Sequence, residues 1–332
     1  MACTCIGRMT GGLSRRGRIV RRRLPRLHTG PRSPYTEHMK LTAPRRTPLD
    51  LAHPRVMGIL NVTPDSFSDG GLHEALEAAV THGLAMAEEG AMVIDVGGES
   101  TRPGAKRVPA AEQKRRVVEV VRRLRAELDA HYPDVWLSVD TTLTAVAEPA
   151  LHAGASLIND ISAGRDDPAM FDLAAAQQVP IVLMHMQGTP ETMQQNPRYS
   201  DVVAEVEAFV LERAEEAVTA GVPRERIVID PGVGFGKTVA HNLHLLAHLG
   251  EFVATGHPVM LGASRKGFIG QVAEMTPRDA KDRVGGTCAT TAVGVWAGVS
   301  LFRVHDVRAN LQAAQVTAAI RMAHQNAGIE QG

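Results

Sequence analysis

From residue 55 onward the chain alternates short aliphatic runs with longer segments of helical periodicity. The runs are rich in Val, Ile and Leu and nearly continuous, as strands are when both faces of a parallel sheet are buried. In chain order they are Val56–Leu60, Ala91–Val96, Val135–Val139, Ser156–Ile158, Ile181–Met184, Ile227–Ile229, Pro258–Leu261 and Ser300–Val304. We therefore expect eight buried parallel strands.

The segments between the runs carry apolar residues at helical spacing. In Glu112–Asp129 they recur at i, i+4, i+7 and i+11, starting from Val117, with arginines expected on the opposite face. Asp201–Val218 has the same kind of stripe. Strand and helix alternating eight times, over about 270 residues, predicts an α/β fold of the (β/α)8 or TIM-barrel type. A doubly wound open sheet is the structural alternative.

Polar residues stand at or just after the ends of these runs. They are Asn61, Asp95, Asp140, Asn159, Asp160, His185, Asp230, Ser264, Arg265, Lys266, Arg303 and His305. Helix caps and turns explain an occasional Ser, Asn or Asp after a strand. They explain poorly a set that also includes Lys266, Arg303 and His305. Because the carboxyl ends of barrel strands meet at one rim, we expect one assembled polar site there.

The length fits one large α/β barrel or two ordinary domains, and the composition predicts an aliphatic core. The chain has 332 residues, of which 44% are hydrophobic but only 4% aromatic. No apolar run approaches the roughly 20 residues needed to cross a bilayer, so we expect no contact with a membrane. The three cysteines, two of them within the first five residues, offer no disulfide framework, and the cytoplasm is the expected location.

Charge divides the chain into a basic tail and an acidic body. The 36 basic and 36 acidic residues balance overall, but residues 1–38 hold nine arginines and a single acidic residue, Glu37. The remainder therefore has 27 basic and 35 acidic residues, a net charge of about −8. An acidic body argues against nucleic acid as a partner.

The tail has three interpretations. It lacks hydrophobic periodicity and is broken by Pro25, Pro31 and Pro34, which is typical of disorder. Its Arg-rich, acid-poor composition also resembles an organellar transit peptide. We favour a third hypothesis, that the chain starts at Met39. The predicted division is an extension at 1–38, disordered if it is made, and a single barrel domain at 39–332.

Two loops follow the first strands: the first could on its own be any flexible rim loop, and the second has the chemistry of an anion site. Residues 61–71 form a polar segment punctuated by Pro and Gly. The segment GGESTRPG, at 97–104, begins with two adjacent glycines, which let backbone N–H groups approach an anion closely. Arg102 within it supplies a planar, permanently charged fork suited to phosphate oxygens.

These loops also carry a resemblance to a known family. NVTPDSFSDGG and DVGGESTRPGA resemble the two signature loops of the dihydropteroate synthases. SVDT, NDIS, LMHMQGTP, DPGVGFGK, ASRKGFIG and RVHDV match that family in the same order, over roughly residues 39–325. One departure is Val233, where family members often carry an aromatic residue. We expect it to alter packing beside the site and not the chemistry.

The resemblance implies a transferase of folate biosynthesis. Such an enzyme condenses (7,8-dihydropterin-6-yl)methyl diphosphate with p-aminobenzoate, giving 7,8-dihydropteroate and pyrophosphate. The electron-rich dihydropterin stabilises positive charge on its exocyclic methylene, so an SN1-like displacement is expected. The resemblance also implies a Mg2+ cofactor, a homodimer and inhibition by sulfonamides.

Residue by residue, the resemblance implies three adjoining subsites. The pterin would contact Asp140, Asn159, Asp230, Lys266 and Met184. The diphosphate would contact Asn61, Thr101, Arg102, Arg303 and His305, and Asn61 would also be the protein ligand of Mg2+. p-Aminobenzoate would contact Thr101, Pro103, Phe235, Ser264 and Lys266. The catalytic residues would be Asp140, Lys266 and Arg102.

Other interpretations of these residues remain open. Met184 has the pattern of ordinary barrel core, and Arg303 and His305 could form a rim salt bridge with Asp306. GVGFGKT at 232–238 resembles a phosphate-binding loop, but Pro231 stands where that motif needs its first glycine. The histidines at 241, 244 and 248 lack a completing carboxylate or thiolate, and we interpret them as a solvated helix face.

Two other functions compete with the synthase. A methyltetrahydrofolate–corrinoid methyltransferase shares the pterin-binding barrel but needs no diphosphate pocket, so the TRPG and RVHD segments argue against it. A non-catalytic pterin-binding paralogue would act as a scaffold or regulator, but nothing in the loops of this chain looks degraded, which argues against it.

Overall fold

Eight parallel strands form a closed barrel in the computed structural model, which describes residues 39–62, 71–274 and 280–329. The strands are β3 (Arg55–Asn61), β4 (Val93–Gly97), β5 (Trp136–Asp140), β6 (Leu157–Asp160), β7 (Ile181–Met184), β8 (Ile227–Asp230), β9 (Met260–Leu261) and β10 (Leu301–Val304). They are ordered β8-β7-β6-β5-β4-β3-β10-β9. Ile229 closes the ring, since it bridges Val259 in parallel and its N–H donates to the carbonyl of Pro258 at 2.9 Å. The TIM barrel is confirmed, and the open sheet is wrong.

The predicted strands agree with the observed ones to within two residues at each end. Ile181–Met184 coincides with β7. The seventh run begins later than predicted, at Met260 and not Pro258, because proline has no N–H to donate to a ladder. The polar residues Asp140, Asp160 and Asp230 are the last residues of their strands.

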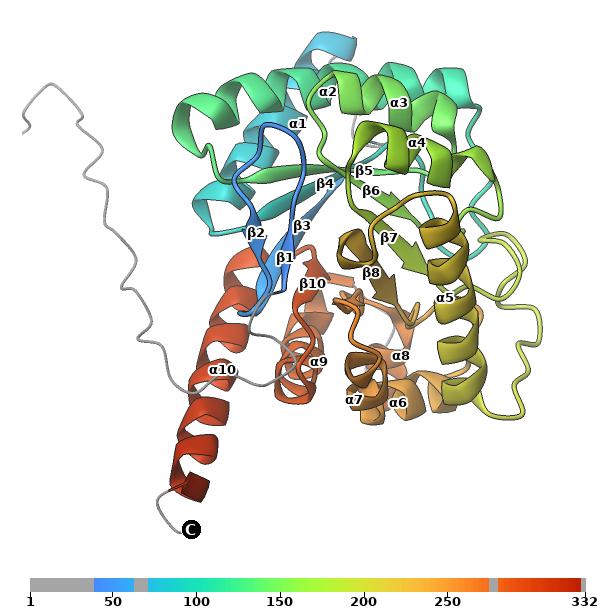
Figure 1. Cartoon of the computed structure of the whole chain (residues 1–332), viewed down its shortest axis with the longest axis vertical. Helices are drawn as coiled ribbons and strands as arrows, with labels where there is room; N and C mark the ends of the chain where they lie inside the picture. Colours follow the sequence, from blue (N-terminus) through green and yellow to red (C-terminus); the bar gives the residue numbers. More distant parts are fainter. Residues whose placement is uncertain (1–38, 63–70, 275–279, 330–332) are drawn as a thin grey trace, which may run out of the picture. The chain divides into compact units, whose positions relative to one another are not determined.

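Ten helices occur in the described ranges, and those between successive strands lie on the outside of the barrel (Figure 1). They are α1 (Gly71–Glu88), α2 (Ala110–His131), α3 (Thr144–His152), α4 (Ala169–Gln177), α5 (Val202–Thr219), α6 (Val239–Ala247), α7 (Leu249–Ala254), α8 (Gly267–Val272), α9 (Val284–Ala297) and α10 (Val307–Ile329). None of these helices is long and apolar enough to span a bilayer. The predicted extension at 1–38 lies outside the described residues, so its interpretations stay predictions.

The predicted stripe of α2 packs on the barrel, with one exception to its polar face. The four apolar positions that start at Val117 are completely buried. Arg125 is buried as well, although arginines were expected on the opposite face. Position 125 lies one turn after Val121 and shares its face, and the guanidinium donates to the carbonyl of Val135 at 2.9 Å and pairs with Asp129.

A small antiparallel hairpin closes the amino end of the barrel. It consists of β1 (Lys40–Leu41) and β2 (Leu49–Asp50). Leu41 and Leu49 are buried in one cluster with residues from the barrel strands, including Trp136 at the start of β5. The Trp136 indole N–H donates to the carbonyl of Thr47 at 3.0 Å. The hairpin fills the amino end, which leaves the carboxyl rim for a ligand.

Candidate active site

The strand register brings the predicted pterin residues together at the carboxyl rim. Asp140 is the direct cross-strand neighbour of Asn159, and Met184 is that of Asp230. All four side chains are buried. The sequence therefore located these residues on adjacent strands of one site.

A buried charge network links four of the strands. Asp95 accepts from the side-chain amide of Asn159 at 2.9 Å and from Nε of Arg303 at 2.6 Å. Nη2 of Arg303 donates to Asp140 at 2.6 Å. Arg303 thus pairs with two carboxylates inside the barrel, and the alternative of a pair with Asp306 is wrong. Asp306 is held instead by Arg265, at 2.9 and 2.5 Å.

Asp95 belongs to this buried network, although the family resemblance assigned it no role. It was noticed only as a polar residue near a strand end, although a lone carboxylate in the aliphatic run VIDVG is itself a signal. Within the described residues, its Oδ1 and the Oδ1 of Asn159 are buried and have no hydrogen-bond partner. Buried polar atoms of this kind are normally satisfied, so the two oxygens are suited to a ligand that donates N–H groups.

Burial and neighbouring charges shift the pKa values of groups in the network. Burial raises the pKa of Asp140 above its ordinary value; the positive charge of Arg303 opposes this and Asp95 adds to it. Burial alone would lower the pKa of Arg303, but Asp95 and Asp140 on either side raise it. Arg303 therefore keeps its positive charge at the rim.

Asp230 and Lys266 form the second part of the site. Oδ1 of Asp230 accepts the N–H of Gly232 at 2.7 Å, which fixes the carboxylate. Burial raises the pKa of Asp230, against the opposing charge of Lys266. Burial lowers the pKa of Lys266 to about 7, although Asp230 raises it. The Lys266 ammonium donates to the carbonyl of Val233, whose side chain is fully buried.

Phe235 is the large apolar side chain among the predicted p-aminobenzoate residues. The Phe235 ring packs in a cluster with Met184 and other methionines, and the Lys266 Nζ lies 4.2 Å from its centroid. Met184 is therefore both a core residue and a neighbour of the site. Thr101 is half-buried and Pro103 is exposed, on the loop after β4.

His305 and Ser264 are joined to each other. The Ser264 hydroxyl lies 3.0 Å from Nδ1 of His305 and accepts the His305 N–H at 3.1 Å. Burial lowers the pKa of His305 to about 4, with Arg265 and Arg303 adding to the effect. Asn61 is the last residue of β3, and Arg102 is exposed on the loop after β4.

Lys237, in the segment that resembles a phosphate-binding loop, is buried under the rim. Its Nζ lies 2.9 Å from Nδ1 of His185 and donates to the carbonyl of Phe235 at 3.0 Å. It therefore supports the loop that carries Phe235. Of the three nearby histidines, His241 closes a capping box with Thr238 at the start of α6.

Comparisons with known proteins show the family of this chain. The family model described as pterin binding enzyme matches residues 57–305. Dihydropteroate synthase of Escherichia coli K12 is 45% identical over 288 residues, which cover 87% of this chain and 99% of that protein. The chain belongs to the dihydropteroate synthase family. Synthase activity in folate biosynthesis follows from this membership. The dihydropteroate synthase of Mycobacterium leprae is 46% identical over 275 residues, which cover 82% of this chain and 95% of that protein.

Solved structures of dihydropteroate synthases share the barrel. The enzyme of Xanthomonas albilineans, solved with 4-aminobenzoic acid, superimposes with a TM-score of 0.78 at 47% identity and covers 85% of this chain and 98% of its own. The same enzyme solved with 7,8-dihydropteroate gives a TM-score of 0.75 at 45% identity, covering 85% and 98%. The relative from Yersinia pestis was solved with a sulfonamide drug, with a TM-score of 0.77 at 45% identity, covering 85% and 99%.

Proposed function

We propose that the carboxyl rim condenses (7,8-dihydropterin-6-yl)methyl diphosphate with p-aminobenzoate. The observation that carries the proposal is the buried set of Asp140, Asn159, Asp230 and Lys266, gathered on one rim by the barrel. These groups complement the hydrogen-bonding edge of a pterin. The Xanthomonas albilineans relative, solved with 7,8-dihydropteroate, supports the same ligand class.

Pterin recognition falls to Asp230 and Asn159. Asp230 accepts from the two adjacent N–H groups of the 2-amino-4-oxo edge, and a charge-assisted bond of this kind contributes about 1.5–3 kcal/mol. The Asn159 amide N–H donates to Asp95, which fixes the orientation of the amide. Its Oδ1 then accepts from the ligand, and Asp140 is the third pterin contact.

The leaving diphosphate is bound by the two rim loops and by β10. Asn61, Thr101, Arg102, Arg303 and His305 contribute hydrogen bonds and positive charge around it. The bond between the exocyclic methylene and the bridging oxygen breaks, and its electron pair leaves with pyrophosphate. Asp140 and Asp230 stabilise the electron-poor pterin.

p-Aminobenzoate completes the reaction from a slot beside the pterin. Thr101, Pro103 and Phe235 enclose its ring, and Ser264 and Lys266 lie beside its carboxylate. The amine lone pair forms the new C–N bond, after which the nitrogen loses a proton. Sulfonamides occupy the same slot, consistent with the drug complex of the Yersinia pestis relative.

Mg2+ fits the proposed diphosphate site. Asn61 offers a hard amide oxygen at the end of β3, and this ion typically takes one or two protein ligands, with phosphate oxygens and waters completing its octahedron. Asn61 would hold the ion, which when bound supplies positive charge to the leaving diphosphate.

We also propose that the chain forms a homodimer and works in the cytoplasm. An exposed apolar strip supports the dimer: it consists of Val293 and Trp296 on α9 and Val316 and Ile320 on α10. A second copy would cover this surface.

Pyrophosphate release tests the reaction directly. Release should require both substrates, whereas a methyltransferase or a binding paralogue would release none.

Asp230→Asn should lower pterin affinity at least tenfold, or about 1.4 kcal/mol, because one acceptor becomes a donor that faces a donor. Asp134→Asn is the matched control, since Asp134 is exposed near the opposite, amino end of β5. Unchanged pterin affinity in Asp230→Asn would remove that residue from the site.

A further inference from the structure

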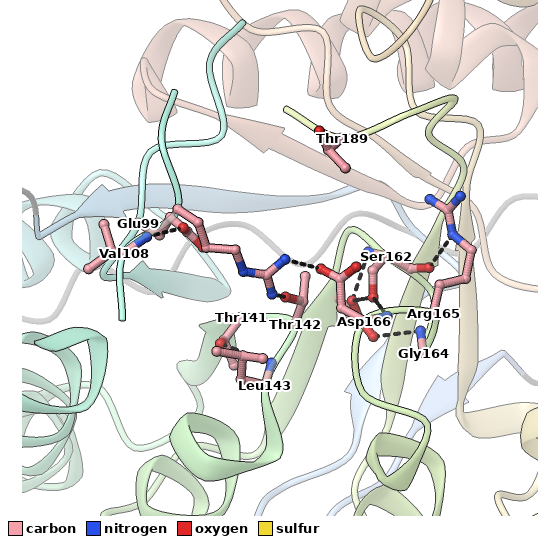
Figure 2. Close-up of polar contacts among 12 residues, drawn as sticks. Glu99, Val108, Thr141, Thr142, Leu143, Ser162, Gly164, Arg165, Asp166 and Thr189 are labelled. Atoms are coloured by element: carbon pink, nitrogen blue, oxygen red, sulfur yellow. Dashed lines mark hydrogen bonds and ion pairs between the residues drawn. The ribbon is translucent and has the colours of Figure 1, made fainter. Parts of the chain in front are cut away.

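The loop that carries Thr101, Arg102 and Pro103 is closed at its base by a single carboxylate. Oε1 of Glu99 accepts the N–H of Val108 at 2.6 Å (Figure 2), and its Oε2 accepts from the side-chain amide of Gln113 at 3.1 Å. Gln113 is buried and also donates to the carbonyl of Val108 at 2.8 Å. Residues 99 and 108 are therefore tied to each other and to α2.

Arg107 leaves this base and crosses to two other rim loops. Its Nη1 donates to Asp166, in the segment after β6, at 2.7 Å. Its Nη2 donates to the hydroxyl of Thr142, in the segment after β5, at 2.6 Å. Figure 2 labels both acceptors, Thr142 and Asp166, and marks these two bonds with dashed lines.

The acceptor Asp166 is itself held in place. Its N–H donates to the Ser162 hydroxyl at 3.2 Å, and that hydroxyl donates to Asp160 at 2.7 Å. Asp160 is completely buried and also accepts the N–H of Gly164 at 2.7 Å (Figure 2). Asp160, one of the polar residues expected at the rim, thus organises a turn, and Arg107 binds to a fixed partner.

We propose that Arg107 is a positioning residue for p-aminobenzoate, an inference that rests on the proposed function. Arg107 follows Thr101–Pro103 by only a few residues on a loop closed at 99 and 108. Its two bonds set that loop against the rim, and the N–H of Gly104 adds a third link, to the carbonyl of Pro190 at 3.0 Å. Without Arg107 the loop would sample arrangements in which the slot is open.

The expected effect is modest because the ion pair is partly exposed. The Arg107 and Asp166 side chains are 48% and 30% exposed, and pairs of this kind are weak and screened by salt. The pair therefore biases the loop by a small factor, and the bias should disappear at high ionic strength.

Arg107→Met in the full chain is the direct test, because it keeps an unbranched apolar stem and removes the charge and both bonds. The KM for p-aminobenzoate should rise about two- to fivefold, with kcat within about twofold. Affinity for free hydroxymethyl dihydropterin, which needs no slot, should stay the same. Added salt should raise the KM of the wild type more than that of the variant.

Two further variants separate positioning from general damage. Arg115→Met removes an ion pair of similar exposure, 51% for Arg115 and 30% for Glu112, and should leave the KM unchanged. Asp166→Asn keeps the bond of Arg107 to Thr142 and should raise the KM less. The double variant Arg107→Met/Asp166→Asn should match Arg107→Met alone, because both remove the same contact.

Three results would overturn the proposal. They are an unchanged KM in an active Arg107→Met enzyme, an equal loss of affinity for p-aminobenzoate and free pterin, and additive effects in the double variant. If the wild type releases no pyrophosphate with both substrates, the proposed function fails, and this inference fails with it.

Discussion

At the scale of single residues, the site depends on charged groups held in partial burial. Lys266 lies between a carbonyl, a carboxylate and an aromatic ring. Burial brings its pKa to about 7, so its charge changes near neutral pH. An anion that binds beside it favours the protonated form.

The affinity for p-aminobenzoate should therefore depend on pH through Lys266. The protonated amine is the form that binds the carboxylate, and above pH 7 the free protein holds mostly neutral lysine. Affinity should fall as pH rises from 7 to 9, by at most about tenfold per unit. Calorimetric titration at several pH values measures it. Lys266→Met should bind weakly with little pH dependence, while the exposed Lys114→Met should behave as wild type; a flat wild-type profile would contradict this role.

At the scale of elements, the segment from β8 to α6 is shaped by glycines. Gly232 has φ +66°, and a Cβ there would lie 1.9 Å from the carbonyl oxygen of His185. Its N–H also holds Asp230. The absence of a side chain therefore lets this loop pass against the end of β7.

Gly232→Ala should be strongly destabilising. Positive φ alone costs an alanine about 1–2 kcal/mol, and the backbone oxygen of His185 cannot rotate away, so we expect a loss of about 3 kcal/mol or more in the free energy of unfolding. Gly256→Ala is the matched control, since Gly256 has φ +83° with no atom within 4 Å of a Cβ, and it should lose only the conformational part. Urea unfolding compares the two; equal losses would show that the loop relaxes around the new methyl group.

The sequence predicted the positions of the strands better than the contacts between residues that are distant in the chain. Strands buried on both faces are continuous aliphatic runs, so all eight were located, but closure through Ile229 and Val259 is a long-range contact without a local signal. Arg303 shows the same difficulty. Asp306 is near it in sequence, yet its partners are 208 and 163 residues away, in β4 and β5. Burial was also hidden, since nothing local marks Lys237 as an internal residue.

At the scale of the whole molecule, one exposed apolar strip stands out among the described residues. Val293, Trp296, Val316 and Ile320 are 47–55% exposed. They lie on α9 and α10, which run side by side (Figure 1). Trp296 packs on the ring of His324, with centroids 5.6 Å apart. Because Val316, Ile320 and His324 are spaced four residues apart, the two helices present one continuous surface.

The proposed homodimer should therefore depend on Trp296 and Ile320. Burying a large apolar side chain contributes about 1.5–3 kcal/mol, so Trp296→Glu or Ile320→Glu should weaken association at least tenfold. Sedimentation over a range of concentrations should show dimeric wild type and monomeric variants. Leu243→Glu, on α6 and 44% exposed, should remain dimeric. A wild type that is monomeric throughout, or a Leu243 variant that dissociates equally, would place the dimer contact elsewhere or exclude it.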